Sequence, residues 1–113
     1  MTERIGDSTM GAVSAWQPIL DGFDENVGGE KGIVRLDEEH PNGARITLEE
    51  GGVSAPWSVT CGVYGLMVHT AFFGSETDAR KAVFVMKARL AAIMDAMGSD
   101  RIYDLVERFV ADF

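Results

Sequence analysis

The hydrophobic and polar pattern is dominated by an uncharged segment in the middle of the chain. Residues 51–75 contain no Asp, Glu, Lys or Arg, whereas charged residues make up 25% of the whole sequence. A segment of this length would carry about six charges by chance. It is rich in β-branched and aromatic residues and lacks helical spacing, which favours a pair of strands buried on at least one face.

The two strands of this segment are predicted over residues 57–63 and 66–73, because apolar and polar side chains alternate there. A tight turn at Tyr64-Gly65 would place Cys61 opposite Val68, and a four-residue loop over residues 62–65 is the alternative. In the tight register the first face carries Trp57, Val59, Cys61, Val63, Leu66, Val68 and Phe72. The opposite face then carries Ser58, Thr60, Met67, His69, Ala71 and Phe73.

The segment before it predicts a β-hairpin. Residues 33–40 and 44–50 flank Pro41-Asn42-Gly43, where proline presets the turn and glycine supplies a positive φ. This register places His40 opposite Ala44 and Leu36 opposite Leu48. The predicted buried face consists of Val34, Leu36, Ile46 and Leu48, and the predicted charge pairs on the other face are Arg35 with Glu49 and Glu39 with Arg45.

The N-terminal part of the chain predicts one helix. Residues 1–7 are polar, and we expect them to be frayed. From Ser8, apolar residues recur at helical spacing at Val13, Trp16, Leu20 and Phe23. Pro18 lies within this stripe, so it either kinks the helix or begins a second one.

Two further helices are predicted after the sheet. Ser75 caps a long helix that Gly98 ends, and its main apolar face consists of Ala79, Ala82, Val83, Met86, Leu90, Ile93, Met94 and Met97. Ser99 or Asp100 begins a last helix, whose apolar stripe consists of Ile102, Leu105, Val106, Phe109, Val110 and Phe113. Phe84, Ala88 and Ala91 fall outside the main apolar face, so the long helix is apolar on more than one side.

The order of these elements is helix, four strands and two helices. Consecutive strands with short links favour an antiparallel meander. We therefore expect a single α+β domain over residues 1–113, with a four-stranded antiparallel sheet, one N-terminal helix and two C-terminal helices.

Composition narrows the classes of partner. A net charge of −8 and an isoelectric point near 4.6 disfavour nucleic acid and anionic membrane as partners, because both require a basic surface on the protein. The single cysteine, Cys61, excludes an internal disulfide and suits a reducing compartment. The N-terminus lacks a secretory signal, and the apolar runs are too short to span a membrane. We therefore expect a cytoplasmic protein.

Few residues are candidates for a catalytic or metal-binding role. His69 is the one histidine predicted within the core of the sheet, and it is either a general base facing Thr60 or a hydrogen-bonded core residue. The tight register places Cys61 on the other face, so a Cys–His couple is not expected. His40, beside two glutamates at a turn, is interpreted as a solvated side chain rather than a metal ligand. No motif predicts a cofactor or a metal.

These observations favour a non-enzymatic binding or assembly module over an enzyme. The surplus of apolar surface predicts a homodimer or a protein partner, with Phe84, Ala88 and Ala91 at the interface. The alternative is a small-molecule-binding protein or a small enzyme with a pocket beside His69. The candidate binding residues of that pocket are Ser58, Thr60, Met67, His69 and Phe73.

Overall fold

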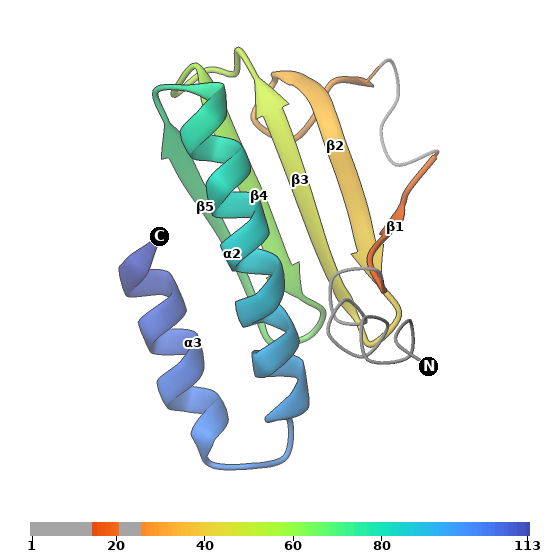
Figure 1. Ribbon diagram of the computed structural model, residues 1–113, viewed down its shortest axis with the longest axis vertical. Helices are drawn as coiled ribbons and strands as arrows, with labels where there is room; N and C mark the ends of the chain where they lie inside the picture. Colours follow the sequence, from red (N-terminus) through yellow and green to blue (C-terminus); the bar gives the residue numbers. More distant parts are fainter. Residues whose placement is uncertain (1–14, 21–25) are drawn as a thin grey trace, which may run out of the picture.

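The uncharged centre and the hairpin before it form one antiparallel sheet. The computed structural model describes residues 15–20 and 26–113, in which the strands are β1 (Gln17–Pro18), β2 (Ile33–His40), β3 (Ala44–Glu50), β4 (Trp57–Val63) and β5 (Met67–Phe73). Their order across the sheet is their order along the chain. Helices α2 (Glu76–Asp95) and α3 (Arg101–Asp112) lie on one face of this sheet (Figure 1). The expected α+β class and antiparallel meander are confirmed, with five strands instead of four.

The fifth strand lies where the N-terminal helix was expected. Gln17 and Pro18 pair with β2, and the backbone N–H of Ile19 donates to the carbonyl of Asp37 at 2.8 Å. The prediction of helix through Pro18 is therefore wrong, because proline disfavours helix in the residue before it and is accepted at a sheet edge. Val13 and Phe23 of the predicted stripe lie outside the described residues.

The β2–β3 hairpin has the bounds and turn that the sequence predicts. His40 lies opposite Ala44, Leu36 lies opposite Leu48, and Gly43 has a φ of +106°. A bulge between Val34 and Leu36 shifts the start of β2 by one residue, which moves side chains to the other face. Val34 consequently lies opposite Glu49 rather than in the row of Leu36 and Leu48.

The bulge also changes the charge pairs of the hairpin. Arg35 forms its ion pair with Glu50, at 2.9 Å, so the expected pair with Glu49 is wrong. Glu39 does lie opposite Arg45, but the guanidinium of Arg45 binds the carboxylate of Asp37, at 2.7 Å.

The register of β4 and β5 differs by one residue from the tight-turn prediction. The loop consists of residues 64–66, so Val63 lies opposite Met67 and Cys61 lies opposite His69. Because side chains alternate between faces, this difference moves every side chain of β5 to the other face. Val68 and Phe72 therefore point away from the helices, and their exposed fractions are 75% and 49%.

The core lies between the sheet and the two helices. It is formed by the inward faces of β3 and β4 with the predicted apolar face of α2, and Ile46, Leu48, Val59, Met86 and Leu90 are fully buried within it. The hydroxyl of Ser75 caps α2 by accepting from the N–H of Asp78 at 3.2 Å. This confirms the predicted start of the helix.

His40 is part of this core, not a solvated residue of the turn. Its ring is buried edge-on against Trp16, with 5.3 Å between ring centroids. Its Nδ1 accepts a hydrogen bond from the backbone N–H of Asn42 at 3.0 Å. His40 therefore closes one end of the core.

Candidate functional site

The sequence placed five candidate binding residues on one sheet face, and the structure divides them between both faces. Met67, His69 and Phe73 are half-buried on the face that carries the helices. Ser58 and Thr60 lie on the opposite face, where Ser58 is buried and the Thr60 hydroxyl is 3.0 Å from that of Thr70. The observed register separates Thr60 from His69, so these five residues do not line a common pocket.

The same register brings Cys61 and His69 together on the inward face. They are cross-strand neighbours, contrary to the expectation that they lie on different faces. The thiol is a poor nucleophile, because burial raises the pKa of Cys61 from 9.0 to about 12. His69 packs edge-on against Phe109, with 6.2 Å between ring centroids. This environment is that of a core pair, not of an activated thiolate.

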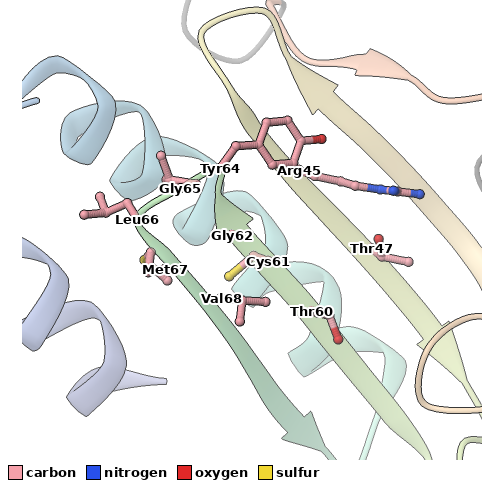
Figure 2. A pocket seen from close by; sticks show the side chains of 11 residues that line it. Arg45, Thr47, Thr60, Cys61, Gly62, Tyr64, Gly65, Leu66, Met67 and Val68 are labelled. Carbon is pink, nitrogen blue, oxygen red and sulfur yellow. The ribbon is translucent and has the colours of Figure 1, made fainter.

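A hollow of about 620 Å³ lies on the open face of the sheet, away from the helices (Figure 2). Its floor includes Gly62, which has no side chain to fill the space between neighbouring strands. A Cβ at Gly62 would come within 2.7 Å of the Met67 carbonyl oxygen, so a larger residue does not fit without movement of the backbone. The other lining residues are Arg45, Thr47, Thr60, Cys61, Val63, Tyr64, Gly65, Leu66, Met67 and Val68.

The polar rim of this hollow is held by hydrogen bonds within the chain. The Tyr64 hydroxyl donates to Glu39 at 2.7 Å, and the pKa of Tyr64 is raised, first by burial and then by this bond. The hydrogen bond to Asp37 raises the pKa of Arg45, whose guanidinium stays fixed beside the hollow. The rim is therefore ordered, and the apolar side chains Leu66 and Val68 lie beside it.

The predicted interface residues lie on the outer face of α2, which points away from the sheet. Phe84 has an exposed fraction of 65%, Ala88 is exposed and Ala91 is half-buried. The structure thus brings these three residues together on one accessible surface. Phe84 also borders two hollows, which it shares with Arg80, one of them reaching Lys87 and the other Lys81.

The C-terminal helix does not cover Phe84. Phe109 and Phe113 of α3 pack on each other, with 5.0 Å between ring centroids, and the guanidinium of Arg89 lies over both rings. Arg89 also forms an ion pair with Asp112 at 2.6 Å. The aromatic side chains of α3 therefore pack against α2 on a different side of that helix from Phe84.

Within residues 15–20 and 26–113, no three His, Cys, Asp or Glu side chains are placed to share a metal ion. No helix in this part of the chain is long and apolar enough to cross a membrane.

Among the residues that line the open-face hollow, Thr60 and Met67 are candidate binding residues in the sequence, and the others were not identified. The sequence predicts only a charge pair for Arg45 and a turn at Tyr64, and it predicts Val68 on the same sheet face as Cys61. The signal that could have found them is the loop length, because a three-residue loop over 64–66 places Val68 and Gly62 opposite each other on one face. Gly62 within a strand is a second signal, since such a glycine marks a close approach of backbone.

Comparisons with protein-family models, with curated proteins and with solved structures find no match to this chain.

Proposed function

We propose that this protein is a non-enzymatic binding and assembly module that works as a homodimer through the outer face of α2. The observation that carries the proposal is the exposure of Phe84, a large apolar side chain with an exposed fraction of 65%. The exposed charged residues Arg80 and Lys81 precede it on α2, and the small residues Ala88 and Ala91 follow it. Clustered apolar surface of this kind is typical of interfaces. The raised pKa of the buried Cys61 thiol supports a role in binding rather than nucleophilic catalysis by this residue.

Sedimentation mass at tens of micromolar tests the proposal. We expect a dimer for the wild-type chain and a folded monomer for Phe84→Asp, because the substitution buries a charge at the interface and leaves the core intact. Val68→Asp is the matched control, since it adds the same charge at an exposed apolar residue on the other face of the molecule. Circular dichroism confirms that both variants are folded.

The outcomes separate the possible surfaces. A wild-type monomer at this concentration overturns the homodimer. A dimer that Val68→Asp dissociates, and that Phe84→Asp does not, places the interface on the open face of the sheet and overturns the role of α2.

A second candidate function is binding of a small apolar molecule in the open-face hollow. Its support is the volume of about 620 Å³ beside the exposed side chain of Val68. His69 does not line this hollow, so the site differs from the pocket that the sequence suggested. Fluorescence of anilinonaphthalene sulfonate tests it: we expect Val68→Asp to abolish dye binding and Phe84→Asp to preserve it. Equal binding by the two variants would count against this site.

A further inference from the structure

The outer face of α2 carries opposite charges at equal distances from Ala88. Lys81 precedes Ala88 by seven residues and Asp95 follows it by seven, so the three lie in one line along the helix. Both charged side chains are exposed. Among the residues that the structure describes, neither forms an ion pair. The helix therefore presents one cation and one anion that lack partners, symmetrically about its middle.

Large and small side chains on this face also lie on opposite sides of Ala88. Phe84 lies four residues before Ala88, and the small residues Ala91 and Ala92 lie three and four residues after it. If a second α2 is laid antiparallel on the first, the bulky end of each helix meets the small end of the other. The phenylalanine ring then has space that a larger residue at Ala92 would fill.

We propose that two copies of the chain pair through antiparallel α2 helices, about a two-fold axis at Ala88. Phe84 of each copy packs on Ala91 and Ala92 of the second copy, and Lys81 of each forms an ion pair with Asp95 of the second copy. Every contact occurs twice, as a two-fold interface requires. This inference rests on the homodimer proposed above and adds its geometry and its charge pairs.

The spacing along the outer face is that of a helix that contacts another helix. Six residues recur at alternating intervals of four and three, which is the spacing of the contact positions in a coiled coil. They are Thr77, Lys81, Phe84, Ala88, Ala91 and Asp95. Alanine near the centre allows the two helix backbones to approach closely.

The charge of the whole chain also favours this face for contact between two identical copies. The chain has a net charge of −8, so two copies repel each other over most orientations. Residues 79–94 contain four basic residues and no acidic ones. Contact through this part of α2 therefore brings no acidic side chains of residues 79–94 against each other.

Charge reversal in the full-length chain tests the geometry. Lys81→Glu and Asp95→Lys each replace two attractive pairs by two repulsive ones, so we expect each to raise the dimer dissociation constant about tenfold. The double variant restores both pairs with their signs exchanged, and we expect wild-type affinity. Lys31→Glu is the control for Lys81→Glu, because it makes the same change of net charge on the loop before β2, away from α2.

Sedimentation across a concentration series measures the dissociation constants of the wild-type chain and of the four variants, and circular dichroism confirms folding. Weakening by both single reversals, with recovery in the double variant, supports the antiparallel pairing. Single reversals that leave the dimer as tight as the Lys31→Glu control overturn this geometry while the homodimer itself stands. A wild-type chain that is monomeric at tens of micromolar overturns both.

Discussion

Glu49 shows how one buried carboxylate organises the loop before β2. Its exposed fraction is 1%, and its Oε1 accepts hydrogen bonds from the backbone N–H groups of Glu30 and Gly32, both at 3.1 Å. A Cβ at Gly28 would lie 2.3 Å from the Glu49 carboxyl carbon, so a larger residue there would displace the carboxylate. The buried carboxyl group is thus held by backbone donors rather than by a basic side chain.

We predict that Glu49→Ala lowers the free energy of unfolding by about 1–3 kcal/mol, because the buried N–H group of Gly32 and the partly buried N–H group of Glu30 lose their acceptor. Glu49→Gln is the matched control. Its single amide oxygen can accept both bonds, so we expect a smaller loss. Urea denaturation measures both. Equal losses for the two variants would mean that the negative charge, and not the oxygen acceptor, holds the loop.

Cys61 gives a prediction about reactivity and pH. Burial raises the pKa of its thiol from 9.0 to about 12, so we expect no reaction with a thiol reagent at pH 8 until the protein is unfolded. The unfolded chain ionises Cys61 above pH 9 while the folded chain does so only near pH 12. Stability from this group is therefore complete below pH 9 and is lost as the pH rises towards 12.

Chemical denaturation at several pH values, with Cys61→Ala as the comparison, measures this loss. The alanine variant retains the contribution of Tyr64, whose pKa is also raised, and lacks that of the thiol. The wild-type chain and Cys61→Ala should differ in unfolding free energy by an amount that changes with pH. A difference that stays the same from pH 8 to 11 would contradict the raised pKa of the thiol. Rapid labelling of the native chain at pH 8 would do the same.

At the scale of elements, the long helix follows from local pattern. Every described residue of its predicted apolar face is buried except Met97, and Leu90 is fully buried between helix and sheet. We predict that Leu90→Ala costs about 2–5 kcal/mol, as the removal of core methyl groups does. Val110→Ala, at a more exposed position of α3, is the control, with an expected cost below about 1 kcal/mol. Similar melting temperatures for the two variants would show that the orientation of α2 is wrong.

The two hairpins, β2–β3 and β4–β5, differ in how well the sequence predicts their turn and register. Pro41-Asn42-Gly43 determines the β2–β3 turn through local backbone preferences, and its bounds and register near the turn were predicted correctly. The β4–β5 loop has no such signal. Both faces of β5 contain large apolar residues, so hydrophobic alternation does not distinguish one register from the next. The small residue Ala71, 2% exposed on the inward face, fits beneath the helices where Phe72 would require more space.

At the scale of the whole molecule, the two tryptophans lie at opposite ends of one core. Trp16 packs on His40 beside the β2–β3 turn, and Trp57 lies opposite Phe73 at the other end of the sheet. Both are buried in the same cluster. A continuous core of this kind favours cooperative unfolding.

We predict that Trp16→Phe and Trp57→Phe, each with one remaining tryptophan, unfold in single transitions. In each variant the midpoint measured by fluorescence should equal the midpoint measured by far-ultraviolet circular dichroism in urea. An earlier fluorescence transition in Trp57→Phe, where Trp16 is the reporter, would show that β1 detaches before the rest of the sheet.

The sequence by itself determined the features that depend on neighbouring residues: the β2–β3 turn, the cap and apolar face of α2, and the α+β class with two helices after the sheet. Tertiary structure decided the rest. The pairing of Gln17 and Pro18 with β2, the bulge at residues 34–36 and the face on which His69 lies all depend on contacts between distant segments. A one-residue difference in strand register has little effect on local preferences and yet exchanges the two faces of a strand. For this reason the outer face of α2 was recognised in advance, whereas the hollow on the open face of the sheet was not.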